Sequence, residues 1–241
     1  MNSNVIQLEW FEISIGMLPM IAVVIILFRW SDRGKTAIYS IVRMLIQLVA
    51  IGYFLVFIFN ATDAWIICLV LAVMLVVASW ISLGPISKDR QRLYPLVLAS
   101  LAIGGGVTLI TVAWGVLRLD PWYTPTYLVP LAGMIFANSM NTLSLSAERF
   151  EAEISNHQSI DAARRIALQT GMIPVINSMF AVGLVALPGM MTGQILSGVS
   201  PLVAVRYQIM VMSMLFAASG LSTAVYLSLV SRLNRTTPSG A

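Results

Sequence analysis

The stretch VALPGMMTGQILSGVSPLVAVRY, residues 185–207, contains an apolar run that stops at Pro188-Gly189 and a second run that starts after Pro201. Proline lacks a backbone N–H and glycine loosens a helix, so a membrane helix reaching this pair leaves carbonyl groups without their usual partners. In a bilayer such a break survives only where protein or water covers the freed groups. The stretch therefore indicates a pore, a gate or a substrate path rather than a plain anchor.

The composition places most of the chain inside a membrane. Of its 241 residues, 59% are hydrophobic and only 10% are charged, whereas soluble domains carry about 25% charged residues. The net charge of +4 comes from basic residues beside the apolar runs, so nucleic acid is not an expected partner. The single Cys68 and the single His157 exclude an internal disulfide and any site that needs several cysteines or histidines.

About seven stretches are apolar and long enough to cross a bilayer, which takes about 20 helical residues. They predict an all-α polytopic fold, with a single transmembrane domain over residues 1–235 and a disordered tail at 236–241. The sixth stretch spans the bilayer only if its helix resumes after the Pro-Gly break. The predicted spans are residues 10–28, 37–59, 64–83, 95–117, 127–145, 172–187 with a broken extension to 196, and 208–230.

The basic residues predict the orientation of the spans, because short loops rich in Lys and Arg stay in the cytoplasm. Eleven of the 14 Lys and Arg residues flank one side of the predicted bundle, and the opposite loops hold only Arg118 and Arg206. We therefore expect the N-terminus outside and the C-terminus in the cytoplasm. The eleven are Arg29, Arg33, Lys35, Lys88, Arg90, Arg92, Arg149, Arg164, Arg165, Arg232 and Arg235.

The longest polar stretch, residues 147–171, falls on the expected cytoplasmic side. Two interpretations are open: a solvated connector between two spans, or an amphipathic helix that docks a cytoplasmic partner. The apolar positions that could form its stripe are Ile154, Ile160, Ala163, Ile166 and Ala167.

The sequence does not support catalysis by this chain. Residues 33–36 (RGKT) match the end of a phosphate-binding loop, but Arg29 replaces the required earlier glycine and an apolar span precedes it. Residues 104–106 (GGG) lie within a span, where glycines permit close helix packing or a kink. No histidine and no pair of acids falls inside a span, so a hydrolase site cannot be assembled there. We expect no enzyme activity and no cofactor bound by this chain.

Polar residues inside the spans are candidates for a solute path. Arg43 either snorkels to the cytoplasmic surface or, with Gln47 one turn further on, faces a polar cavity. Asn138 and Asn141 either form inter-helix hydrogen bonds, worth roughly 0.6–2 kcal/mol each, or line a path that Asn177 could join.

The methionines raise the question of a soft-metal site, because thioethers suit copper(I). Met190 and Met191 lie near the expected outer loop, and Met210, Met212 and Met214 lie early in the last span. No second ligand type clusters with them, and methionine commonly fills gaps in apolar packing. Packing is therefore the favoured interpretation, and a metal site stays unassigned.

Residues 187–198 (LPGMMTGQILSG), continued by Pro201 and residues 204–211 (AVRYQIMV), closely resemble the FetB-type permeases. These are membrane subunits of ATP-binding-cassette transporters linked to iron export, and plant aluminium-tolerance permeases belong to the same family. The resemblance covers nearly the whole chain. It also includes residues 130–135 with Asn138 and Met140, residues 173–174 with Asn177 and Ser178, residues 182–185, and Arg43 and Gln47 with residues 52–53.

The resemblance implies a multi-pass permease of the bacterial inner membrane that forms a homodimer and pairs with a separate cytoplasmic ATPase, which would hold ATP and Mg²⁺. The interrupted helix itself predicts a gate or hinge at Pro188, Gly189, Met190, Met191, Thr192 and Gly193. The resemblance assigns coupling to the ATPase to Ser155, Asn156, His157, Gln158, Asp161, Arg164 and Arg165.

The chain departs from the family in the segment expected to contact the ATPase. There the family carries a longer helix that ends in a Leu-Gly-Ala-Thr/Ser-Pro-like turn, and the Leu-Gly-Ala portion with about one preceding turn of helix is missing here. Three functions remain open besides ABC-driven export of iron or a related metal species. These are an ion-coupled secondary transporter, ABC export of a nucleotide sugar or other anion, and a non-transporting scaffold.

Overall fold

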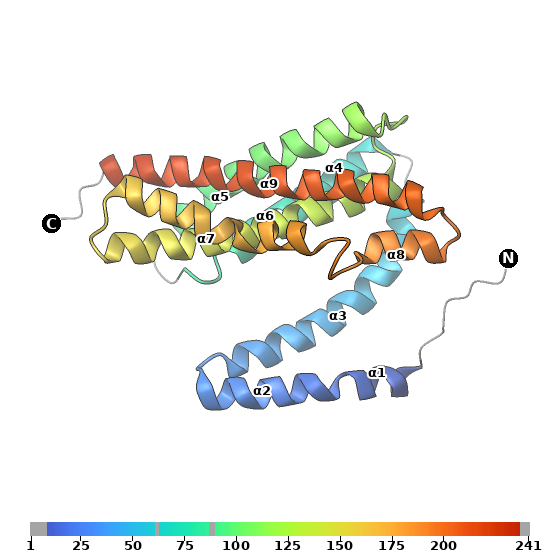
Figure 1. Cartoon of the computed structure of the whole chain (residues 1–241), viewed down its shortest axis with the longest axis horizontal. Helices are drawn as coiled ribbons and strands as arrows, with labels where there is room; N and C mark the ends of the chain where they lie inside the picture. The colour runs from blue at the N-terminus through green and yellow to red at the C-terminus, as the bar shows by residue number, and fades with distance from the viewer. Residues whose placement is uncertain (1–8, 61–62, 87–89, 237–241) are drawn as a thin grey trace. The chain divides into compact units, whose positions relative to one another are not determined.

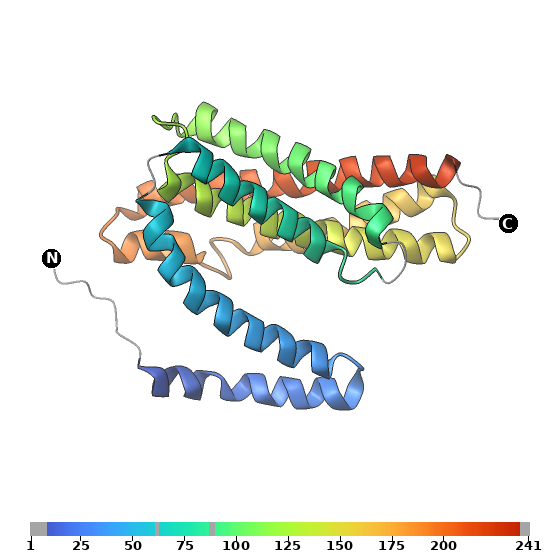
Figure 2. The same cartoon turned by 180° about the vertical axis from the view of Figure 1, so that it is seen from behind.

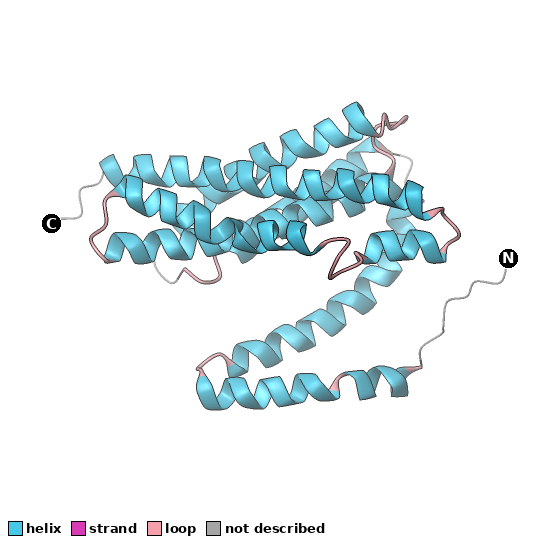
Figure 3. Cartoon of the chain, in the orientation of Figure 1, coloured by secondary structure: helices cyan, strands magenta, loops and turns pink. Residues whose placement is uncertain are grey.

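The structure, a computed structural model, describes residues 9–60, 63–86 and 90–236, and its regular elements in these ranges are helices (Figure 3). It divides into two compact units, residues 1–61 and residues 62–241, and each is described by itself. Residues 237–241 of the predicted disordered tail lie outside the described ranges. The all-α class predicted from the sequence is confirmed.

The N-terminal unit is a helical hairpin of α1 (Trp10–Gly16), α2 (Leu18–Trp30) and α3 (Gly34–Phe59). Glu9 and Glu12 form a capping box at the start of α1, and Pro19 starts α2, where its missing N–H costs nothing. Gly34 lies against the ring of Phe28 at the hairpin turn, where a Cβ would collide with the ring. Apolar side chains cover the exposed faces of these helices, as expected for contact with lipid.

The C-terminal unit is a helical bundle built around α6 and α9. Helix α6 packs against α4, α5, α7 and α9, and α8 packs against α9; Figures 1 and 2 show the bundle from its two sides. A short π-helix, η1, continues α5. The elements are α4 (Ala64–Ser82), α5 (Arg90–Ile110), η1 (Thr111–Val116), α6 (Pro125–Ser155), α7 (Ile160–Ala181), α8 (Gly189–Leu196) and α9 (Pro201–Thr236).

Glycines let the helices of this unit approach closely. A Cβ at Gly104 of α5 would lie 2.7 Å from the Cα of Ser222 of α9, and one at Gly171 of α7 would lie 2.7 Å from the Thr142 carbonyl of α6. Small residues are the usual means by which membrane helices come into backbone contact. The close-packing role predicted for residues 104–106 is thus confirmed at Gly104, whereas Gly106 faces open space.

Six helices of the described chain are long and apolar enough to cross a membrane, which confirms a polytopic membrane protein. The predicted sixth span, residues 172–187, is not one of them, because the helix there starts at Ile160 with a charged first half and ends at Ala181. A seventh crossing would need α7 and α8 together and stays a prediction, as does the orientation of the termini. The six are Trp10–Trp30, Gly34–Phe59, Ala64–Ser82, Arg90–Val116, Pro125–Ser155 and Pro201–Arg235.

Candidate transport path and coupling end

The sequence predicts a helix break at Pro188-Gly189, whereas in the structure the helix ends earlier in the chain. Helix α7 ends at Ala181, and residues 182–188 form a turn before α8 begins at Gly189. The Ala181 carbonyl accepts three N–H groups, from Leu184 at 3.2 Å, Val185 at 2.8 Å and Ala186 at 3.1 Å. Gly183 has a φ of +82°, a left-handed conformation that glycine alone adopts at no steric cost. Gly183 therefore ends the helix, and Pro188 is the N-cap residue of the next one.

The predicted gate residues are thus a helix start rather than an interruption. Gly189 to Gly193 lie in α8, and the Thr192 hydroxyl donates to the Pro188 carbonyl at 3.1 Å. The first N–H groups of a helix have no partner inside it, and no side chain caps α8. Two half-helices that meet at an irregular turn are the arrangement with which many membrane transporters form substrate paths.

The turn itself exposes apolar side chains. Leu184 and Val185 are 88% and 86% exposed, so other residues of the unit do not bury them. An exposed apolar pair of this kind favours association or membrane contact.

Met190 of α8 lies on an apolar cavity of about 280 Å³ with two further methionines, Met134 of α6 and Met210 of α9. Tyr127 and Tyr207 also line it. Among the described residues, no group of three or more His, Cys, Asp or Glu side chains could hold a metal ion. The packing role of Met190 stays a prediction.

The three candidate asparagines lie on neighbouring helices. The Asn138 amide donates to the Met134 carbonyl of its own helix at 3.0 Å, so that bond is not an inter-helix contact. Gly171 packs against Thr142, and α6 and α7 are antiparallel, so Asn177 lies near the level of Asn138. Asn141 and Asn177 are exposed, and exposed amides within a span are expected to face a polar path or a partner.

The two remaining path candidates belong to the other unit. Arg43 is half-buried and Gln47 is exposed on α3 of the N-terminal unit. Neither the snorkelling nor the cavity interpretation of Arg43 is tested by this placement, and both stay open.

The predicted coupling segment is a helical hairpin rather than a loop. Ser155 ends α6, Ser159 caps α7 by accepting the Ala162 N–H at 3.3 Å, and only residues 156–159 separate the two helices. Residues 147–155 belong to α6, where Phe150 and Glu153 are buried and keep the helix in the bundle, and residues 160–171 form the first half of α7. Docking of a cytoplasmic partner at this stretch stays a prediction.

The hairpin turns at His157. Its φ is +60°, the Gln158 N–H donates to the Glu153 carbonyl at 3.1 Å, and the His157 N–H donates to the Ile154 carbonyl at 3.0 Å. These bonds define a Schellman motif, in which glycine usually takes the left-handed position. No glycine marks this turn in the sequence.

Charged residues join this hairpin to the end of α9. Asp161 lies in the first turn of α7 and pairs with Arg164 at 3.3 Å and with Arg235 of α9 at 2.9 Å. Arg165 is exposed beside them. Arg235 was not among the residues predicted to couple to the ATPase. The available signal was its position just after the last predicted span, on the expected cytoplasmic side.

Comparison with known proteins gives the family. The chain matches UPF0014, described as an uncharacterised protein family, over residues 10–234, and it belongs to that family. It is 35% identical to a UPF0014 membrane protein of Synechocystis sp. over 92% of both chains. It is 31% identical to the "probable iron export permease protein FetB" of Escherichia coli, over 93% of this chain and 91% of that one.

A plant protein is similarly related. Identity to the "protein ALUMINUM SENSITIVE 3" of Arabidopsis thaliana is 32%, over 91% of this chain and 88% of that one. No solved structure matches the chain significantly. The resemblance to the FetB-type permeases predicted from residues 187–198 is thereby confirmed.

Proposed function

We propose that this chain is the membrane-spanning permease subunit of an ATP-binding-cassette transporter that exports iron or a related metal species. ATP and Mg²⁺ would bind a separate cytoplasmic ATPase subunit. The observation that carries the proposal is the 31% identity to the probable iron export permease FetB over 93% of this chain. The discontinuous pair α7 and α8 supports it, because broken helices are typical of transport paths.

The fold offers a mechanical link between the two ends of the bundle. Helix α7 extends over 22 residues from the coupling end at Ile160 to the break after Ala181, with Pro174 inside it, a length of about 33 Å at 1.5 Å per residue. An ATPase that tilts the exposed hairpin tip would move the break at the other end, as packed helices do in shear and hinge motions.

A permease homodimer fits the exposed turn. Leu184 and Val185 are apolar side chains that the rest of the C-terminal unit leaves exposed, and a second permease would bury them. Two permeases and two ATPases would then form the working transporter, with ATP binding drawing the ATPases and their attached hairpins together.

The chemistry of the path residues favours one alternative substrate. Arg43 and the amides of Asn138, Asn141 and Asn177 can donate hydrogen bonds to an anion. A nucleotide sugar, another anion or an anionic metal complex would therefore suit the same path.

The test is transport by the purified components. The chain is co-expressed with each candidate cytoplasmic ATPase, the complex is placed in proteoliposomes, and export is measured for iron and for a nucleotide sugar. Export that needs ATP and disappears with a hydrolysis-deficient ATPase supports the proposal, and the preferred solute identifies the substrate. Failure of every ATPase to co-purify, together with transport that persists without ATP, would replace it with an ion-coupled transporter.

A further inference from the structure

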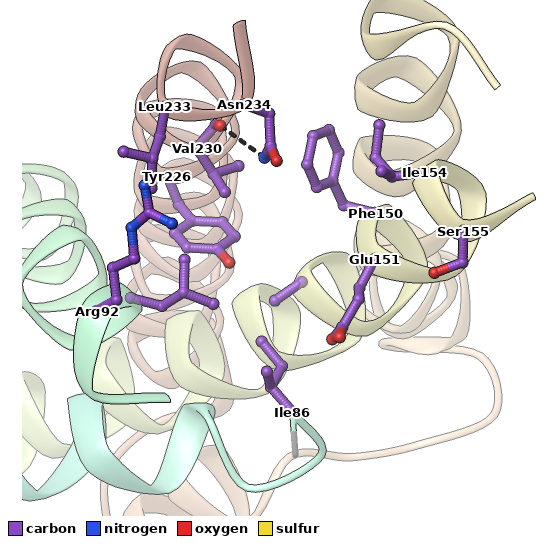
Figure 4. Close-up of a pocket in the computed structure, with 12 residues that line it drawn as sticks. Ile86, Arg92, Phe150, Glu151, Ile154, Ser155, Tyr226, Val230, Leu233 and Asn234 are labelled. Carbon is purple, nitrogen blue, oxygen red and sulfur yellow. Dashed lines mark hydrogen bonds between the residues drawn. The ribbon is translucent and has the colours of Figure 1, made fainter. Parts of the chain in front are cut away.

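A cavity of about 210 Å³ lies at one end of the C-terminal unit (Figure 4). Arg92 reaches it from the first turn of α5, Glu151 from the last turns of α6, and Asn234 from the last turn of α9. These three helices are candidate membrane spans. Helices that cross a bilayer end at or beyond its headgroups, so ligands can reach these terminal turns from the membrane surface or from water.

The cavity contains the hydroxyl of a tyrosine that is otherwise buried. Tyr226 of α9 is 1% exposed, and its hydroxyl points into the cavity (Figure 4). Tyrosine hydroxyls in such positions normally have a hydrogen-bond partner, and a molecule bound in the cavity can supply one.

The groups around Tyr226 are mainly hydrogen-bond acceptors. Glu151 contributes a carboxylate and Ser155 a hydroxyl. The Asn234 amide nitrogen donates to the Val230 carbonyl at 3.0 Å, so its oxygen remains available to accept. A set of acceptors that includes one carboxylate suits a primary ammonium, which carries N–H donors and a positive charge.

The opposite wall carries the opposite charge. Figure 4 shows Arg92 and Glu151 on two sides of the Tyr226 ring. Apolar side chains, including Leu93 and Phe150, line the space between them. A ligand that complements both walls has an ammonium at one end, an anionic group at the other and a short aliphatic linker.

We propose that this cavity binds such a zwitterion, and that its source is the headgroup of phosphatidylethanolamine in the adjacent leaflet. The ammonium donates hydrogen bonds to Glu151, Tyr226 and Asn234, and the phosphate lies against Arg92. A choline headgroup is excluded, because its quaternary ammonium has no N–H to donate. The site does not depend on the transport function proposed above.

The first experiment measures which lipid the full chain retains. The protein is extracted from vesicles that contain equal amounts of phosphatidylethanolamine and phosphatidylcholine with matched acyl chains, and bound lipid is counted by native mass spectrometry. The wild type retains the ethanolamine lipid with about a tenfold preference, which corresponds to one charged hydrogen bond. Glu151→Gln and Tyr226→Phe lose the preference. Glu148→Gln is the control, because Glu148 is exposed on the same helix and does not line the cavity.

The second experiment separates the lipid from a free zwitterion. O-phosphoethanolamine is added to the protein in phosphatidylcholine nanodiscs, and the unfolding temperature is recorded. A rise in the wild type but in neither variant, without lipid preference in the first experiment, assigns the site to a soluble zwitterion. Equal lipid retention by wild type and both variants, together with no wild-type response to O-phosphoethanolamine, overturns the proposal.

A structural role for Tyr226 has its own signature. Without ethanolamine compounds, Tyr226→Phe is expected to unfold at the same temperature as the wild type, since in the proposal the hydroxyl bonds the ligand rather than another part of the fold. A clearly lower unfolding temperature in phosphatidylcholine alone would show that the hydroxyl already has a partner, and would overturn the proposal.

Discussion

The guanidinium of Arg235 and the carboxylate of Asp161 lie 2.9 Å apart and join the last turn of α9 to the first turn of α7. The two residues are 74 positions apart in the sequence. Each charge also suits its own helix end, because acids stabilise helix N-termini and bases stabilise C-termini. The predicted coupling end is therefore held by a surface ion pair that a docking partner could rearrange.

Removing this pair should affect coupling more than stability. Arg235→Gln is expected to lower the free energy of unfolding by only about 0.2–1 kcal/mol, because both side chains are more than half exposed. The loss should shrink at high salt. If the pair positions the hairpin for the ATPase, ATP-driven transport falls several-fold while unfolding in detergent changes little.

A double-mutant cycle isolates the pair. Asp161→Asn also removes the contact with Arg164, so it should cost slightly more than Arg235→Gln alone. The double variant should lose less than the sum of the two single losses, because the pair is already broken in each. Strict additivity would show that Asp161 and Arg235 do not interact.

The sequence predicted the membrane class and most of the helices, because long apolar runs determine both. It did not predict where α6 and α7 begin and end. The charged residues 147–155 continue α6, since Arg149 pairs with Glu153 one turn on and Phe150 remains buried. Conversely, the apolar run after Ala181 is not helical, because the break depends on one backbone conformation at Gly183.

Site residues whose role depends on long-range packing could not be predicted from the sequence either. Arg235 looked like one of several basic residues at a helix end, and its partner is decided by how α9 and α7 meet. The motif at Pro188-Gly189 correctly indicated a discontinuous helix, because proline limits helices locally. Its exact position required the φ angle of a glycine within an apolar run.

Neighbouring glycines of α5 should respond in opposite ways to alanine. Gly104→Ala places a methyl group 2.7 Å from the Cα of Ser222, so α5 and α9 must separate, at a cost of about 1–3 kcal/mol. Gly106→Ala meets nothing within 4 Å and should be neutral or stabilise the helix by up to about 1 kcal/mol. Unfolding of both variants in the same detergent gives the comparison. Equal effects would mean that α5 and α9 are not in backbone contact at Gly104.

The break after α7 should depend on Gly183 rather than on Pro188. Gly183→Ala forces an alanine into a left-handed conformation, which costs roughly 1–2 kcal/mol, and should slow transport if the turn is a gate. Gly193→Ala is the control, because Gly193 is helical with open space around it, and it should leave stability equal or higher.

Hydrogen exchange tests the same point without a transport assay. In Pro188→Ala the amides of residues 184–187 should exchange at the wild-type rates, because Gly183 and the bonds to the Ala181 carbonyl hold the turn in place. A clear gain of protection over the wild type at these amides would show that proline alone interrupts the helix.

Cysteine labelling should settle both the orientation and the seventh crossing. Cys68 is the single cysteine of the sequence, so Cys68→Ser provides a background free of thiols. In intact cells, a membrane-impermeant maleimide should label Asp120→Cys, in the loop between η1 and α6, but should label Asn156→Cys only after permeabilisation. Asp120 and Asn156 are exposed, as is Ser197, the residue after α8 that serves as the third labelling position.

Ser197→Cys decides whether α7 and α8 together cross the membrane. If they do, it is labelled from the same side as Asp120→Cys, because one crossing separates Asn156 from Ser197. If it is labelled from the same side as Asn156→Cys, α7 and α8 do not cross, and the six helices with sufficient hydropathy are the only spans among the described residues. In that case the turn at Gly183 cannot be an outer gate, and the path through α7 and α8 would have to be abandoned.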